Sequence, residues 1–187
     1  MTTDRLVFDA LEFAVEAHGS VGHLRKGTRF PYLIHPIRVG WILERHGFDD
    51  ELVAAGLLHD TLEDTKVTSE QIAERFGDRV ARYVEAATAD KTLEWRPSRE
   101  ATVAKIAKLE ADVLPLLAAD KVDNVRSIRD TLAERGEEET WLLFNSDRSD
   151  NEWYYRSLSE AFLARDPDRP LFQTLDREVD AVFPAAI

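Results

Sequence analysis

The pair His59-Asp60 ends the segment DDELVAAGLLHD, in which residues 52–58 carry no polar side chain. A helix that is apolar over most of its surface lies inside a protein. Polar groups at such a place are costly unless they find partners. The pair is therefore either a satisfied helix end, with Asp60 capping the next turn, or part of a metal site, because imidazole and carboxylate are metal ligands.

Two distant residues favour the metal site. His35 stands at an expected helix start in IHPIRV, where the proline suits the first helical turn. Asp120 interrupts an otherwise apolar helix face in LPLLAADKVDN, and a divalent cation is a good partner for such a carboxylate. Two imidazoles with two carboxylates favour Mn, Fe, Ni or Zn over Ca or Mg, with positions left for water and a substrate phosphate. The expected ligands of one metal ion are His35, His59, Asp60 and Asp120.

More polar groups follow these ligands at helical spacing. Glu63 and Asp64 each come four residues after a member of the His-Asp pair, so a continuing helix would turn both toward the metal. A carboxylate there can accept the proton of the water that attacks phosphorus. Asn124, four residues after Asp120, could donate to a ribose or phosphate oxygen. The alternatives are an acidic solvated turn and a surface amide.

Helical periodicity runs through almost the whole chain, and strand-like alternation is absent. Thr68 and Gln71 form a capping-box signature, and Gly77 closes that helix. The second expected helix is predicted to bury Ile37, Trp41 and Ile42. Aromatic residues of the C-terminal part are expected in the core, although one of them could close over a ligand. The expected helices cover about residues 6–18, 35–46, 50–60, 68–76, 78–88, 99–110, 112–135, 141–165 and 170–183.

Composition indicates one all-α domain over residues 1–187, a bundle of about eight to ten helices. The 187 residues with 44% hydrophobic content can close one core, and no stretch reaches the length of a membrane span. A net charge of −12 argues against binding nucleic acid or an anionic membrane through the whole surface. The absence of cysteine and of an apolar leader at the start favours a cytoplasmic location.

Five motifs in order carry a resemblance to a known family. They are RKGTRFPYLIHP, LLHDTLEDT, FG, TADKTL and LAADKVDN, between about residues 14 and 128, with a helical extension behind them. The order His, His-Asp, Asp resembles the signature of the HD phosphohydrolase superfamily. Together the motifs resemble the (p)ppGpp hydrolase domains of RelA/SpoT-type stringent-response proteins and the standalone small alarmone hydrolases.

The resemblance implies a helical HD fold and one Mn²⁺ at the four ligand positions named above, other transition metals remaining open. It implies that Glu63 and Asp64 activate the water that removes the 3′-diphosphate of the alarmone. Positions that match nucleotide-contacting residues of the family are Arg25, Lys26, Lys91 and Asn124.

The chain also departs from the family pattern. A lysine that usually precedes the metal aspartate is missing in LLAADKVDN, and Asp123 adds a negative charge. Nucleotide contacts are what vary, so substrate identity stays open. The leading hypothesis is a ppGpp 3′-diphosphatase. The alternatives are an HD phosphatase of other specificity, such as a 5′-nucleotidase or a dinucleotide 2′-phosphatase, and a non-catalytic nucleotide-sensing module.

Overall fold

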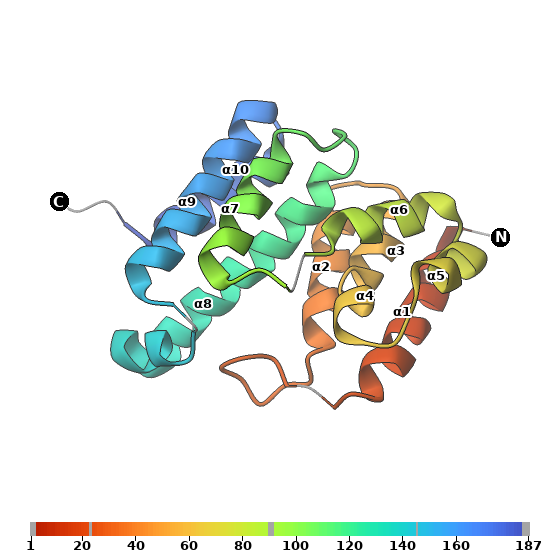
Figure 1. The fold of residues 1–187 in the computed structure, drawn as a ribbon, viewed down its shortest axis with the longest axis horizontal. Coiled ribbons are helices and arrows are strands. Elements are labelled where there is room, and N and C mark those ends of the chain that lie inside the picture. The colour runs from red at the N-terminus through yellow and green to blue at the C-terminus, as the bar shows by residue number, and fades with distance from the viewer. Residues whose placement is uncertain (1–2, 23, 90–91, 145, 185–187) are drawn as a thin grey trace. The chain divides into compact units, whose positions relative to one another are not determined.

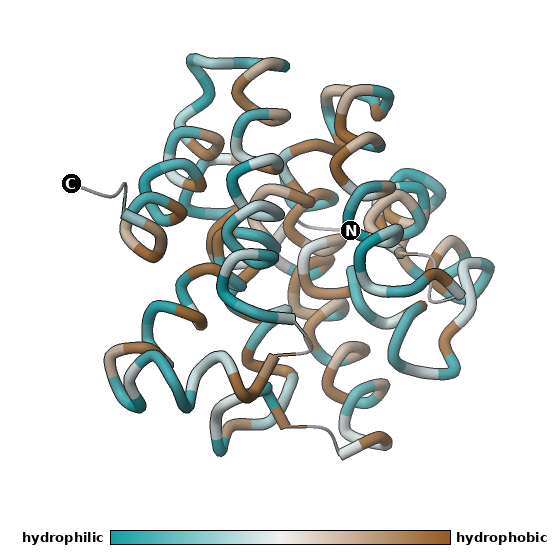
Figure 2. The backbone as a smooth tube through the Cα atoms, turned by 60° about the vertical axis from the view of Figure 1, so that its left-hand side comes forward, coloured by the Kyte–Doolittle hydropathy of each residue, from teal (hydrophilic) through white to brown (hydrophobic). Residues whose placement is uncertain are grey.

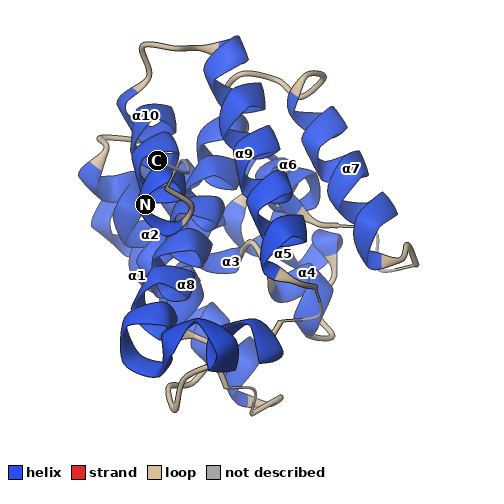
Figure 3. Ribbon diagram, turned by 90° about the vertical axis from the view of Figure 1, so that its left-hand side faces the viewer, coloured by secondary structure: helices blue, strands red, loops and turns tan. Residues whose placement is uncertain are grey.

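Residues 3–22, 24–89, 92–144 and 146–184 are described by a computed structural model, whose helices run from α1 to α10 (Figure 1). Within these residues no strand occurs, as Figure 3 shows, and the all-α prediction is confirmed. The only extended pairing described there is an isolated bridge between Leu24 and Pro31. The chain divides into two compact units, residues 1–88 and 89–187.

The first unit is built around α3, the segment predicted to be central. Its helices are α1 (Thr3–Gly19), α2 (Ile34–Arg45), α3 (Asp50–Leu58), α4 (Thr61–Asp64), α5 (Ser69–Phe76) and α6 (Asp78–Ala87). Every residue of α3 from Leu52 to Leu58 is buried, because α1, α2 and α6 all pack against it. Figure 2 shows hydrophobic residues recurring along the helices, as expected for amphipathic elements around a core.

Two glycines let α2 and α3 approach closely. A Cβ atom on Gly56 would lie 2.8 Å from Leu43 Cδ1 and 3.1 Å from the Cα atom of Gly40. A Cβ on Gly40 would come within 3.0 Å of Leu57 Cδ2. The backbones of the two helices therefore meet at this crossing, and it sets the position of the α2 residues relative to the end of α3.

The predicted capping box at the start of α5 is present. The Thr68 side chain accepts the Gln71 amide, and the Gln71 side chain accepts the Thr68 amide. In α2, by contrast, the predicted burial of Trp41 is wrong, because its side chain is 61% exposed. The amphipathic pattern assigned this tryptophan to the apolar face, but in the structure that side of the helix faces solvent.

The second unit contains α7 (Trp95–Ile106), α8 (Leu114–Leu142), α9 (Arg148–Arg165) and α10 (Pro170–Val182). Helix α10 packs against α8 and α9, and α7 packs against α9. Gly136 has φ of 79° and interrupts α8, which agrees with the predicted helix end at residue 135. Helix α7 starts four residues before the predicted residue 99, because Pro97 lies in its first turn, where a missing amide hydrogen costs nothing.

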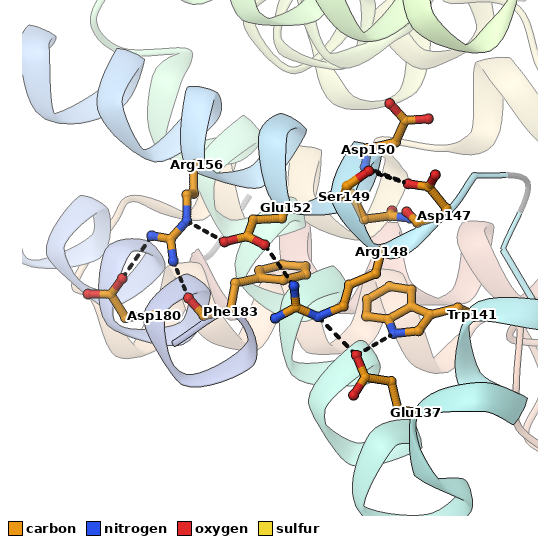
Figure 4. Close-up of polar contacts among 11 residues, drawn as sticks. Glu137, Trp141, Asp147, Arg148, Ser149, Asp150, Glu152, Arg156, Asp180 and Phe183 are labelled. Atoms are coloured by element: carbon orange, nitrogen blue, oxygen red, sulfur yellow. Dashed lines mark hydrogen bonds and ion pairs between the residues drawn. The ribbon is translucent and has the colours of Figure 1, made fainter. Parts of the chain in front are cut away.

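Charged side chains form hydrogen bonds and ion pairs within α9 and between α9 and α10 (Figure 4). Glu152 accepts from Arg148 at 2.9 Å and from Arg156 at 3.0 Å. Arg156 also reaches Asp180 at 3.1 Å and the carbonyl of Phe183 at the end of α10. Among the aromatic residues expected in the core, Tyr154 and Tyr155 are buried, while Trp141, Phe144 and Trp153 are half-buried.

No helix among the described residues is long and apolar enough to cross a membrane.

Candidate metal centre

The end of α3 fixes the orientation of the His59 ring. His59 is the C-cap residue of α3 and is only 2% exposed. Its Nδ1 atom lies 2.9 Å from the carbonyl oxygen of Gly56. A carbonyl can only accept, so Nδ1 carries a hydrogen, and Nε2 is the ring nitrogen that could bind a metal. A histidine held in this way is typical of metal ligands, whose second nitrogen is oriented by a hydrogen bond.

His35 approaches the same point from the first turn of α2. Its backbone amide donates to the Tyr32 carbonyl at 2.9 Å, and its side chain is 2% exposed. Its Nε2 atom lies 3.6 Å from Asp60 Oδ2, while His59 Nε2 lies 3.1 Å from that same oxygen. Two imidazole nitrogens and one carboxylate oxygen of the first unit therefore converge.

The spacing of these three atoms fits a shared cation. Ligand atoms about 2.1 Å from a metal are separated by roughly 3.0 Å in octahedral and 3.4 Å in tetrahedral geometry. The two measured separations, 3.1 and 3.6 Å, lie close to this range. Asp60 is about 15% exposed, so solvent retains access to its edge. The donor set, two nitrogens with a carboxylate oxygen, suits a divalent transition metal better than Ca²⁺.

Asp120 lies on α8 in the second unit, with two partners from its own helix. Lys121 Nζ is 2.6 Å from Asp120 Oδ2, and Asn124 donates its side-chain amide to Asp120 Oδ1. Burial alone would lower the pKa of Lys121, but the Asp120 carboxylate outweighs it and holds the pKa above its usual value. Asn124 therefore shares a face with Asp120, as expected from the spacing. The role of Asp120 as a fourth metal ligand stays a prediction.

The orientation expected for Glu63 and Asp64 depended on a helix that continues past Asp60, and the helix does not continue. Helix α3 ends at Leu58, and the short helix α4 begins at Thr61. The amides of Glu63 and Asp64 nevertheless donate to the Asp60 carbonyl at 3.2 and 2.9 Å, so a helical turn still links Asp60 to both carboxylates. Both side chains are half-buried. Their role in proton transfer stays a prediction.

The two basic residues that the resemblance assigned to the nucleotide lie in the loop before α2, and they differ in burial. Arg25 is 8% exposed, whereas Lys26 is exposed. The loop folds back on itself, because the Arg25 amide donates to the Phe30 carbonyl at 2.9 Å and Gly27 adopts φ of 77°. Arg25 is therefore no solvated surface charge. Lys91 lies outside the described residues.

Tyr32 is a site residue that sequence reasoning missed. Its hydroxyl donates to Asp60 Oδ2, the oxygen that faces both imidazoles. A tyrosine three residues before His35, inside the motif RFPYLIHP, was the available signal. One tyrosine in an irregular segment has no periodicity, so its partner could be seen only in the structure.

The chain resembles known proteins over most of its length. The HD domain family matches residues 10–145. The guanosine-3′,5′-bis(diphosphate) 3′-pyrophosphohydrolase MESH1 of Danio rerio is 36% identical over 126 residues, which cover 66% of this chain and 69% of that protein. The guanosine-3′,5′-bis(diphosphate) 3′-pyrophosphohydrolase of Aquifex aeolicus is 40% identical over 122 residues, which cover 64% of this chain but only 17% of that longer protein.

A solved structure extends the likeness in three dimensions. The protein lmo0812 from Listeria monocytogenes superimposes with a TM-score of 0.73 at 34% identity, covering 80% of this chain and 98% of the other. The family match spans well over half of the chain, and it contains His35, His59, Asp60 and Asp120. The chain belongs to the HD domain family.

Proposed function

We propose that the protein is a metal-dependent nucleotide pyrophosphohydrolase that removes the 3′-diphosphate of ppGpp. The observation that carries this proposal is the convergence of His35 Nε2 and His59 Nε2 on Asp60 Oδ2. Such a site suits hydrolysis at phosphorus, and a chain 36% identical over 126 residues is named for this reaction.

The metal of the proposal is one Mn²⁺, held by His35, His59 and Asp60 together with Asp120. A divalent ion supplies Lewis acidity to the phosphoryl group and makes water a nucleophile near neutral pH. We propose that residues 1–187 work as one HD domain, as predicted from the sequence. The family match supports this, since it runs from residue 10 to residue 145 through both units.

The protein's own groups have distinct parts in this proposal. Glu63 and Asp64 act on the attacking water, and one of them accepts its proton; the backbone turn that links both residues to Asp60 supports this. Water adds to the phosphorus attached to the 3′ oxygen, that P–O bond breaks, and the ribose oxygen takes a proton, so the products are GDP and diphosphate. The groups proposed to hold the nucleotide are Arg25, Lys26, Lys91 and Asn124.

The net charge of the protein also favours a small nucleotide as its partner. With a net charge of −12, an anionic nucleotide is attracted by the metal and nearby cations rather than by the surface as a whole. We accordingly propose a small nucleotide, neither nucleic acid nor a membrane, as the partner. A cytoplasmic site of action suits a chain without cysteine.

A panel assay tests the function. The protein is incubated with Mn²⁺ and, separately, with ppGpp, pppGpp, NADPH and 5′-nucleotides, and the products are identified by chromatography. Diphosphate and GDP from ppGpp are the expected products. Orthophosphate from 5′-nucleotides or NADPH, with ppGpp unchanged, would instead identify a phosphatase of other specificity. Absence of hydrolysis in protein that binds no metal would identify a non-catalytic module.

A further inference from the structure

Tyr32 connects the loop before α2 to the carboxylate at the end of α3. Its hydroxyl donates to Asp60 Oδ2, across 28 positions of sequence. Its carbonyl accepts the amide of His35 at 2.9 Å, so the hydroxyl contacts one proposed ligand while the backbone positions another. The proposed reaction assigns no role to Tyr32.

The Tyr32 ring contacts two histidine rings. The centroid of His18, at the end of α1, is 5.5 Å away, and the centroid of His35 is 5.8 Å away at an interplanar angle of 64°. The side chain is half-buried and His18 is 5% exposed. These two contacts restrict the rotamers of the tyrosine, and the direction of its hydroxyl is therefore largely determined before any ligand arrives.

The Tyr32 hydroxyl donates its hydrogen bond to the carboxylate oxygen that is proposed to bind the metal. Oδ2 of Asp60 lies 3.1 Å from His59 Nε2 and 3.6 Å from His35 Nε2. An ionised carboxylate oxygen offers about two acceptor directions. The hydroxyl of Tyr32 takes one of them, on the same oxygen that both imidazole nitrogens approach.

We infer that Tyr32 is a positioning residue, which orients Asp60 Oδ2 toward the cation and thereby sets the metal affinity of the site. This inference rests on the proposed metal centre. The comparable effect in other metal sites, where a hydrogen-bonded group behind a ligand is removed, is a loss of about 10- to 100-fold in metal affinity.

Calorimetric titration of metal-free protein with Mn²⁺ tests the inference without any turnover. Tyr32→Phe keeps the ring between His18 and His35 and removes only the hydroxyl. Its dissociation constant is expected to rise by about 10-fold or more. Tyr83→Phe is the matched control, because Tyr83 is a buried tyrosine of the same unit whose ring contacts Arg79 and Arg82 on α6. Its metal affinity is expected to equal that of the wild type.

The thermal unfolding midpoint of each metal-free variant separates positioning from folding. The Tyr32→Phe protein is expected to lose metal affinity at an unfolding midpoint close to that of Tyr83→Phe. Equal Mn²⁺ affinity in wild type and Tyr32→Phe would overturn the inference while leaving the metal centre intact. An affinity loss matched by Tyr83→Phe would overturn it as well. A wild-type protein that binds no Mn²⁺ would instead defeat the proposed function itself.

Discussion

The imidazole rings of His35 and His59 meet edge to face, with centroids 5.0 Å apart and an interplanar angle of 75°. One ring nitrogen of each lies within 4.8 Å of the other. The close crossing of α2 and α3 brings them together, although 24 positions of sequence separate them. A transition metal binds imidazole through the lone pair of a ring nitrogen, so two rings that meet in this way can supply two ligands to one ion.

Replacement of Gly56 tests whether that crossing holds the site. Gly56→Ala would place a methyl group 2.8 Å from Leu43 Cδ1, and its carbonyl, which orients His59, would shift with the backbone. We expect a loss of about 1–3 kcal/mol in the free energy of unfolding, together with weaker Mn²⁺ binding. Chemical denaturation and metal titration measure both.

Gly19→Ala is the control for this prediction, because a Cβ at Gly19 meets no atom within 4 Å. Its unfolding free energy should stay within about 0.5 kcal/mol of the wild type. Equal stability of the two variants would show that the helices tolerate a wider crossing.

Asp120 and Asp130, ten positions apart on α8, allow a matched comparison. Asp120→Asn is expected to weaken Mn²⁺ binding by more than about 100-fold, since a ligand should matter more than the groups behind it. Asp130 is exposed, and among the described residues its ion pair is with Arg129 at 3.7 Å, so Asp130→Asn should bind as the wild type does. Asp120→Asn also weakens the ion pair with Lys121. Circular dichroism is therefore used to check that this variant is folded. Unchanged affinity in Asp120→Asn would remove this residue from the ligand set.

Glu63 should separate turnover from metal binding. Glu63→Gln removes the proposed proton acceptor but no proposed ligand, so turnover of ppGpp should fall by about 10²- to 10⁴-fold at unchanged Mn²⁺ affinity. Glu74→Gln, an exposed position on α5, serves as the control with wild-type turnover. A parallel loss of metal affinity in Glu63→Gln would place the residue among the ligands instead.

Alkaline pH should destabilise the second unit through Tyr155. Burial raises the pKa of Tyr155 to about 12, above the ordinary value of 10.0. The unfolded chain releases this proton first, so the stabilising contribution is complete below pH 10 and is lost as the pH rises toward 12. The contribution is at most about 3 kcal/mol. Urea denaturation between pH 8 and 11 should show a smaller decline for Tyr155→Phe than for the wild type.

Local signals in the sequence were sufficient for much of the fold. The Thr68–Gln71 capping box and the glycine at 136 each act within one turn, so their effect is readable from neighbouring residues. The apolar run of α3 likewise required a central helix. The separate short helix α4 was not predicted, because the spacing of Glu63 and Asp64 suits one continuous helix and two successive helices equally well.

Burial and contacts between distant segments were harder to predict from the sequence. The burial of Arg25 and the exposure of Trp41 depend on which elements cover them, and no local pattern records that. The hydrogen bond from Tyr32 to Asp60 joins two segments through one side chain each. Ligand types could be predicted from chemistry, since few residues bind metals, whereas the groups that orient them belong to many residue types.

The central claim is that side chains from separate segments bind one cation. Anomalous diffraction from crystals grown with Mn²⁺ tests it most directly. We predict a single strong peak about 2.2 Å from Nε2 of His35, Nε2 of His59 and a carboxylate oxygen each of Asp60 and Asp120. A peak elsewhere, or no peak near the two imidazoles at saturating Mn²⁺, would contradict it.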